Sequence, residues 1–117
     1  MAGATISIAR NFSRYPSGRF RSDGPHNGQK FREEVLAPAM REVLRKSGKV
    51  TIILDDVAGL PASFLEEAFG GLVRSGFDKN EILSHLNIET SQLRLQRYPS
   101  QILAAIEKAL PDLARAG

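Results

Sequence analysis

Ser63 is a candidate regulatory residue because it stands where a helix is expected to begin. With Glu66 it forms the pattern S-x-x-E of a capping box, in which the serine hydroxyl accepts a hydrogen bond from the amide three residues later. A phosphoryl group on this hydroxyl would lie at a helix N-terminus, where the helix dipole favours negative charge. The pattern favours a cap, and a phosphosite at Ser63 is compatible with that role.

Asp55 and Asp56 form a carboxylate pair directly after the apolar stretch VTIIL of residues 50–54. Such a stretch is typical of a strand covered on both faces, and ligand sites in open sheets commonly lie at the ends of strands. Two carboxylates could bind Mg²⁺ or divide acid and base roles between them. Because no third ligand stands at a readable spacing, a solvated turn is the favoured interpretation, and we predict no metal site.

Residues 18–32 combine a glycine-bearing loop, a helix start and four basic side chains, which are the ingredients of an anion cradle. We expect the loop of residues 18–28 to close over the N-terminus of the following helix and to hold a sulfate or phosphate. The glycine spacing G-x5-G-x3-G fits neither the P-loop nor the dinucleotide fingerprint. The predicted anion-binding residues are Arg19, Arg21, Gly24, Asn27, Gly28, Lys30 and Arg32.

Positive charge is concentrated at the start of the chain. The net charge is +3, but residues 1–32 hold six basic groups against Asp23 alone, an excess of +5. Such an excess attracts phosphate, nucleic acid or an acidic partner. Aromatic residues interleave with these cations, as in proteins that hold single-stranded nucleic acid, although phenylalanines at such spacings more often cover a sheet edge. Binding of an anion, nucleotide or nucleic acid is therefore the second functional hypothesis.

The composition excludes several classes of protein. A chain of 117 residues, 42% hydrophobic and 25% charged, is an ordinary globular domain. It has no cysteine, which excludes disulfides, thiolate catalysis and sulfur-based zinc sites, and its two histidines leave little for a metal. No nucleophile elbow or oxyanion motif is present, so we expect no enzymatic activity and no cofactor. The first ten residues lack a secretory signal, and we expect a cytoplasmic location without a membrane span.

Hydrophobic periodicity predicts alternating strands and helices in one domain of residues 1–117. Alternation predicts strands at residues 4–10, 50–54, 86–88 and 93–95, with room for a short one near 19–21. Helical spacing predicts helices at residues 28–46, 63–76 and 78–84, and a last one from Pro99. We expect a kink at Pro38, and caps at Asn27 and Asp78. The fold class is α/β, with a mixed sheet of about four strands packed with helices.

The helix expected from Ser63 has a clear buried face. Its apolar stripe predicts that Phe64, Leu65, Phe69 and Leu72 are core residues while Glu66 and Glu67 face solvent. Gly70 and Gly71 stand in its interior, where each glycine costs ~1 kcal/mol relative to alanine. Either a close neighbour inside the domain or a docking face for a partner backbone would offset that cost. In the last helix, Ile102, Leu103, Ile106 and Leu110 are expected to share a face.

Three stretches of the sequence resemble a known family. They are LPASFLEEAFGGLVR at residues 60–74, VTIILDDV at 50–57 and GRFRSDGPHNGQKFREEVLAP at 18–38. Together they resemble the STAS-like domain family of uncharacterised function, whose name records similarity to sulfate-transporter and anti-sigma-factor-antagonist domains. The resemblance runs over nearly the whole chain and implies a STAS-like fold.

The resemblance also implies a kind of function. Members are small bacterial or phage-encoded cytoplasmic domains, sometimes beside or fused to histidine-kinase-like ATPases, and none has established catalytic residues. In the antagonist proteins a strand leads into a loop with a phosphorylatable serine at a helix start. Residues 50–56 followed by Ser63 resemble this arrangement, with a longer loop and no Asp-Ser pair. The expectation is a non-enzymatic regulatory domain whose protein partner could be such an ATPase, contacted through Pro61, Ser63, Glu66, Glu67, Gly70 and Gly71.

Overall fold

Three parallel strands form the sheet of the computed structural model, which describes residues 3–112. The strands are β1 (Ala4–Ser7), β2 (Val50–Ile53) and β3 (Leu86–Glu89), hydrogen-bonded in the order β1-β2-β3. Both pairs are parallel, with Ala4 opposite Val50 and Val50 opposite Leu86. The α/β class is confirmed, whereas the expected mixed sheet of about four strands is wrong.

Polar side chains explain why the other expected strands do not form. The carboxylate of Asp23 accepts hydrogen bonds from the amides of Arg19 and Phe20, which turns the chain into the 3-10 helix η1 (Arg21–Asp23). Residues 93–95 form the 3-10 helix η4 (Leu93–Leu95), with Leu95 buried. The first strand ends early because Ser7 caps the short helix α1 (Ile8–Asn11).

Two long helical segments each contain a π turn. The first joins α2 (Gly28–Phe31), the π turn η2 (Arg32–Leu36) and α3 (Ala37–Lys46). It begins at the predicted cap, where the Asn27 side chain accepts from the amide of Lys30. Proline cannot donate a backbone hydrogen bond, and the distortion expected at Pro38 lies in the π turn that precedes it.

The second long segment joins α4 (Ala62–Leu65), the π turn η3 (Glu66–Gly70) and α5 (Gly71–Arg74). It is followed by α6 (Lys79–Ser84), which the predicted cap Asp78 begins, and by α7 (Tyr98–Lys108), with Pro99 in its first turn. The expected helices are therefore confirmed. The two π turns contact each other. No helix within residues 3–112 is long and apolar enough to cross a membrane.

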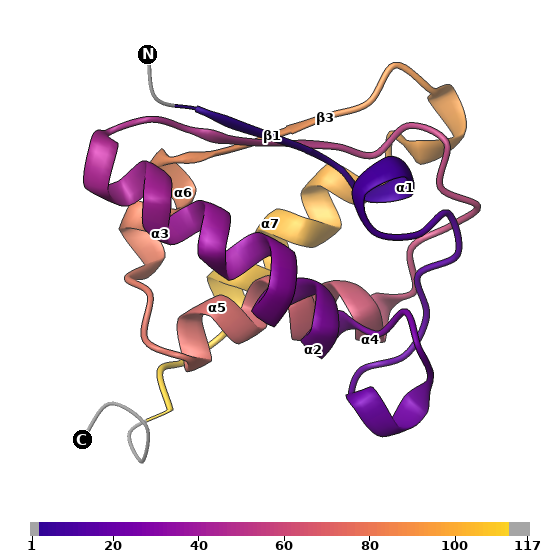
Figure 1. Ribbon diagram of the computed structural model, residues 1–117, viewed down its shortest axis with the longest axis horizontal. Helices are drawn as coiled ribbons and strands as arrows, with labels where there is room; N and C mark the ends of the chain where they lie inside the picture. Colours follow the sequence, from indigo (N-terminus) through magenta and orange to yellow (C-terminus); the bar gives the residue numbers. More distant parts are fainter. Residues whose placement is uncertain (1–2, 113–117) are drawn as a thin grey trace.

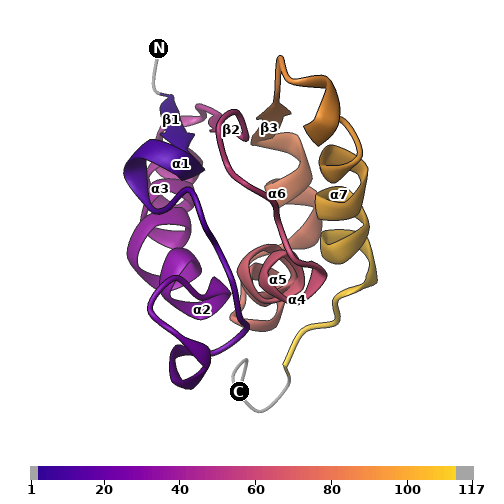
Figure 2. The same cartoon turned by 90° about the vertical axis from the view of Figure 1, so that its right-hand side faces the viewer.

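The long helices form one layer beneath the sheet (Figure 1). In Figure 2 the segment of residues 28–46 lies on one side, α6 and α7 lie on the other, and α4 and α5 lie between them. The core fills the space between this layer and the sheet. The four predicted core residues of the second segment are all buried, and Phe31 and Phe64 pack with their ring centroids 5.7 Å apart. In α7 the buried face includes Ile102 and Ile106, whereas Leu103 is exposed. Leu110 lies beyond the end of α7 and is exposed too, which corrects the prediction that the four share a face.

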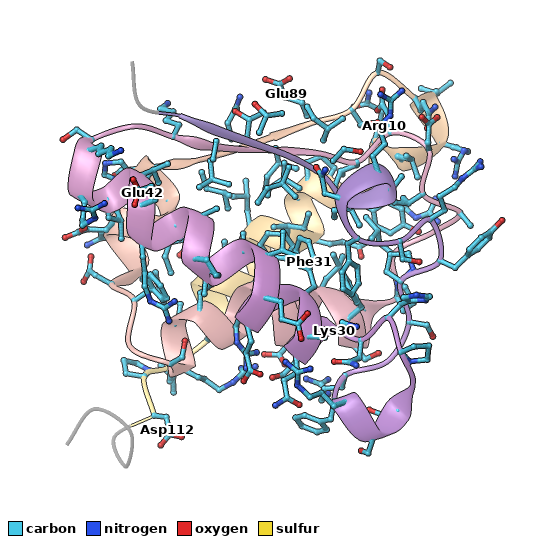
Figure 3. All side chains as sticks on the ribbon, in the orientation of Figure 1. Arg10, Lys30, Phe31, Glu42, Glu89 and Asp112 are labelled. Atoms are coloured by element: carbon cyan, nitrogen blue, oxygen red, sulfur yellow. The ribbon has the colours of Figure 1, made fainter. Side chains whose placement is uncertain are left out.

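The other face of the sheet is open. Thr5, Asn87 and Glu89 are exposed there, and Glu89 projects away from the helices (Figure 3). On β2, Val50 and Ile52 are buried beneath the sheet while the alternate residues are only half-buried, so the prediction of a strand covered on both faces is wrong. At the carboxyl ends of the strands, α1 and η4 close one end of the molecule (Figure 1). The loop after β2 passes along this end on its way to α4.

Candidate functional site

A surface hollow of about 470 Å³ lies beside the start of α4. We call it the tyrosine groove, and its lining residues are Tyr15, Pro16, Ser17, Ala58, Gly59, Leu60, Pro61 and Tyr98. Most of its wall is apolar. Tyr15 is 67% exposed, whereas Tyr98 is only 7% exposed and forms part of the floor. An open apolar hollow with tyrosines in its wall suits contact with another molecule.

Long-range hydrogen bonds hold the walls of the tyrosine groove in place. The amide of Ala58 donates to the carbonyl of Arg14 over 2.7 Å, which fixes the loop after β2 against the loop after α1. From the opposite side, Arg94 donates to the carbonyls of Val57 and Ala58 over 2.7 and 3.2 Å. Arg97 donates to the hydroxyl of Tyr98 over 2.9 Å and lies over its ring. The shape of the groove is therefore set before any partner binds.

A second, smaller hollow of about 270 Å³ lies between α4 and α7. Its lining is Ala62, Leu65, Glu66, Gln101, Ala104, Ala105 and Lys108. Pro61 belongs to the tyrosine groove and Ala62 to this hollow, so the two meet at the first residues of α4, which are exposed. The start of α4 thus lies between two recesses. The far wall of the tyrosine groove comes from residues 15–17 and Tyr98, and the far wall of the second hollow comes from α7.

Ser63 does not cap a helix, which corrects the predicted capping box. Helix α4 begins at Ala62, so Pro61 occupies the cap position, and its carbonyl accepts the hydrogen bond from Leu65. The Ser63 side chain lies inside the first turn, is half-buried, and forms no hydrogen bond with residues 3–112. Whether Ser63 is modified remains a prediction, but the hydroxyl is at least not occupied as a cap.

Glu66 and Glu67 belong to one ion-pair network, in which Glu66 is half-buried and Glu67 is buried. Arg32 donates over 2.6 Å to both the carboxylate and the carbonyl oxygen of Glu67, and the two residues are 4% and 7% exposed. Arg74 lies 2.5 Å from the carboxylate of Glu66, which also receives a hydrogen bond from Arg19. The prediction that Glu67 faces solvent is wrong because Arg32, from the neighbouring π turn, compensates its burial.

The ion pairs also set the protonation of Glu66. Burial opposes its ionisation, but the hydrogen bonds from Arg74 and Arg19 outweigh burial and lower the pKa of the carboxyl below its usual value. The same contact raises the pKa of Arg74. Both groups are therefore charged at neutral pH, and the carboxylates predicted as partner contacts already pair with cations of their own chain.

Close packing explains the glycine pair in the second helical segment. A Cβ atom on Gly71 would overlap the guanidinium of Arg32, and one on Gly70 would lie 2.8 Å from a carboxylate oxygen of Glu66. Both glycines are buried. Of the two explanations for the pair, close approach within the domain is the one observed. Buried as they are, Gly70 and Gly71 offer no backbone for a partner to dock on, which corrects their prediction as partner contacts.

The basic loop closes over the helix start as predicted, but with its own carbonyl groups. The amides of Gly28 and Gln29, at the start of α2, donate to the carbonyls of Gly18 and Arg19 over 3.0 and 2.9 Å, and the next amide is capped by Asn27. Gly24 lies in this loop, and its carbonyl accepts a hydrogen bond from the Asn27 side chain. The amides that would hold an anion at this helix end are therefore occupied.

The arginines predicted to bind an anion have carboxylate partners. Arg21 contacts Glu33 and Glu34 over 3.0 Å each, and its hydrogen bond lowers the pKa of Glu33. Arg19 and Arg32 join the network with Glu66 and Glu67. Lys30 lies partly exposed on α2 (Figure 3) and forms no ion pair within the described part of the chain. The structure thus places the three predicted arginines against acidic groups of the same chain and leaves only Lys30, of the four predicted cations, without a carboxylate partner among the described residues.

Asp55 and Asp56 hold the loop after β3. Asp55 accepts hydrogen bonds from the hydroxyls of Ser91 and Thr90, and these bonds lower its pKa. Asp56 adopts φ +76° and exchanges two hydrogen bonds with the Gln92 side chain. Within residues 3–112 no three acidic or histidine side chains are grouped to hold a metal ion. The turn interpretation fits this arrangement, with the turn braced by neighbouring polar groups.

Sequence reasoning missed Tyr98, Arg94 and Arg97. The alternation around Arg94 predicts a strand, and at the start of the last helix the sequence pattern points only to Pro99. Arg94 contacts a loop more than 30 positions earlier in the chain, so no local pattern announces its role. The one local signal was the exposed aromatic ring of Tyr15 beside Arg14 in the basic region.

Fold and site together define the class of this protein. It is a parallel α/β domain with one helical layer, an internal ion-pair network and an open apolar groove. Comparison with protein-family models matches residues 27–93 to the STAS-like domain of unknown function (DUF4325). The match covers more than half of the chain, so the chain belongs to this family. The matched region is shorter than the stretch over which the sequence resembles the family, and it does not include Tyr15 or Tyr98. Comparisons with curated proteins and with solved structures gave no match.

Proposed function

We propose that the chain is a non-enzymatic regulatory domain that binds a protein partner through the tyrosine groove and the exposed start of α4. The observation that carries the proposal is the position of Pro61 and Ala62 between two preformed apolar recesses. A histidine-kinase-like ATPase is the class of partner that we propose, on the strength of the resemblance described above.

The charges of the second helical segment support a binding role more than a chemical one. The carboxylates of Glu66 and Glu67 are engaged with arginines of the same chain, so they position the helix and are not poised for proton transfer. The uncharged start of α4 can lose its water on binding at little cost, because it has few polar groups to leave unpaired. Ser63 lies one residue further on, so a phosphoryl group there would place negative charge at the edge of the proposed interface.

Site-specific photo-crosslinking tests the proposal. A benzoylphenylalanine in place of Ala62 is expected to form one predominant protein adduct in the host cell, and mass spectrometry would identify that protein. The matched control places the same group at Arg45, which is exposed on α3. The purified partner should then bind the wild type, and Ala62→Arg should weaken binding more than Arg45→Ala, because a bulky cation at Ala62 obstructs the surface.

The proposal is overturned if adducts at position 62 are no more frequent or specific than adducts at position 45. It is also overturned if the identified protein binds Ala62→Arg with unchanged affinity while circular dichroism shows that the variant is folded. To test the switch, binding by Ser63→Asp is compared with that by Ser63→Ala. A loss confined to the aspartate variant would support regulation by negative charge.

A further inference from the structure

The arginines of the chain fall into two groups. Within residues 3–112, five of them contact a carboxylate within 4.0 Å: Arg19, Arg21, Arg32, Arg45 and Arg74. The other five described arginines, Arg10, Arg14, Arg41, Arg94 and Arg97, have no such contact in the described chain, and all five are exposed. Three of these, Arg14, Arg94 and Arg97, adjoin residues that line the tyrosine groove, whereas Arg41 lies over the ring of Phe77.

Each of the three is oriented by a hydrogen bond to an uncharged group, and for Arg94 and Arg97 this group belongs to a lining residue of the groove. Arg94 donates to the carbonyl of Ala58, a lining residue, and Arg97 donates to the hydroxyl of Tyr98, another lining residue. Arg14 precedes Tyr15 in the chain and donates to the carbonyl of Asp56 over 3.4 Å. A carbonyl or hydroxyl orients a guanidinium without cancelling its charge, and each guanidinium has five N–H donors, more than these bonds use.

We infer that the tyrosine groove takes a segment of a partner protein that carries carboxylate side chains next to apolar ones. This inference rests on the proposed function and specifies the chemistry of its partner. Apolar side chains of the segment would enter the groove between Tyr15 and Pro61. Its Asp or Glu residues would pair with the arginines at the rim, where Arg favours planar contact with carboxylates.

Three carboxylates near this end partly offset the positive charge: Asp55, Asp56 and Glu89, which lines one hollow together with Asp55. Asp55 is bonded to Thr90 and Ser91, and Asp56 to Gln92, so both are directed at the loop after β3. Asp56 also lines a neighbouring hollow with Arg10 and Arg14. Arg10, a residue of α1, lies at the same end of the molecule and forms no ion pair among the described residues (Figure 3). Four arginines against these three carboxylates leave this end with a net positive charge.

A protein segment fits the groove better than single-stranded nucleic acid does. Nucleic-acid grooves of that kind need aromatic faces on which successive bases stack. Here the ring of Tyr98 is almost fully buried, and the guanidinium of Arg97 already lies 4.6 Å from its centroid. Only Tyr15 presents an open ring, and one ring does not form a platform for successive bases.

Titration of the isotope-labelled full chain with synthetic peptide pools, followed by amide chemical shifts, tests the inference. The pools are ten-residue peptides of Leu, Pro and Phe in which the remaining positions hold Glu, Gln or Lys. The Glu pool is expected to shift the amides of residues 15, 17 and 58–60, with an affinity roughly tenfold above that of the Gln pool, as expected for three exposed ion pairs. The Lys pool should bind more weakly than either.

The double variant Arg14→Gln and Arg97→Gln should reduce the preference for Glu over Gln to roughly twofold, because only Arg94 of the three arginines remains. Arg45→Gln is the control, with a charge change on α3. Equal binding of the Glu and Gln pools at the groove overturns the inference but leaves the proposed function standing. No shift at the groove with any pool also overturns it, and crosslinking at position 62 then decides the proposed function separately. Shifts caused by an oligothymidylate and not by the Glu pool would assign the groove to nucleic acid instead.

Discussion

Replacing Arg32 by methionine should destabilise the domain strongly because it removes one partner of a buried ion pair. Removing one member of such a pair typically costs about 3–5 kcal/mol, since the other charge is left without compensation. Glu67 would still have Arg74 at 3.5 Å and Arg19 at 3.8 Å from its carboxylate. We therefore expect the lower end of that range, ~3 kcal/mol, for Arg32→Met.

The double variant Arg32→Met and Glu67→Leu should recover most of the lost stability, because replacing both charges by apolar groups is often neutral. Urea unfolding followed by far-ultraviolet circular dichroism measures both variants, and an unchanged m value would show that the same surface is exposed on unfolding. The reasoning is refuted if Arg32→Met costs less than ~1 kcal/mol. It is also refuted if the double variant loses the sum of the two single losses, since that would mean the charges do not interact.

Three further predictions concern packing, capping and pH. Gly71→Ala should cost ~1–3 kcal/mol in thermal or urea unfolding, because the added methyl group meets the Arg32 guanidinium, and a gain in stability from helix propensity alone would contradict this. Asn27→Ala should cost about 0.5–2 kcal/mol, whereas Ser63→Ala should leave the free energy of unfolding nearly unchanged, since Asn27 caps a helix and Ser63 does not. The pKa of Glu66 is lowered on folding, so its stabilisation is present above the unfolded pKa and is lost as pH falls through the folded pKa. Stability measured from pH 7 downward should fall less steeply for Glu66→Gln than for the wild type, and parallel curves would exclude this contribution.

Local patterns were sufficient for the helices of this fold. Asn27 and Asp78 were predictable caps because capping depends on an amide three residues away. The stripe of Phe64, Phe69 and Leu72 similarly fixed the buried face of the second helical segment. The same reasoning failed at Ser63 because a capping box also needs an extended residue before the helix, and Pro61 already supplies it.

The sheet and the site depended on contacts that no local pattern contains. Leu93–Leu95 alternates like a strand, but the hydrogen bonds of Arg94 to the loop after β2 tie this stretch to a distant segment as a 3-10 turn. The charge of Glu67 predicted exposure, and only the position of Arg32 on the facing π turn reverses that expectation. The tyrosine groove joins three stretches far apart in sequence, so its residues could be recognised only once the chain was folded.

Cross-saturation between the labelled chain and the partner identified by crosslinking at position 62 tests the central claim most directly, because it reports which amides lie within the interface. The account predicts loss of intensity at Tyr15, Ala58, Gly59 and Ala62, with signals of the open sheet face at Thr5 and Asn87 unchanged. Loss at Thr5 and Asn87 with full intensity around the tyrosine groove would contradict it and would place the partner on the sheet.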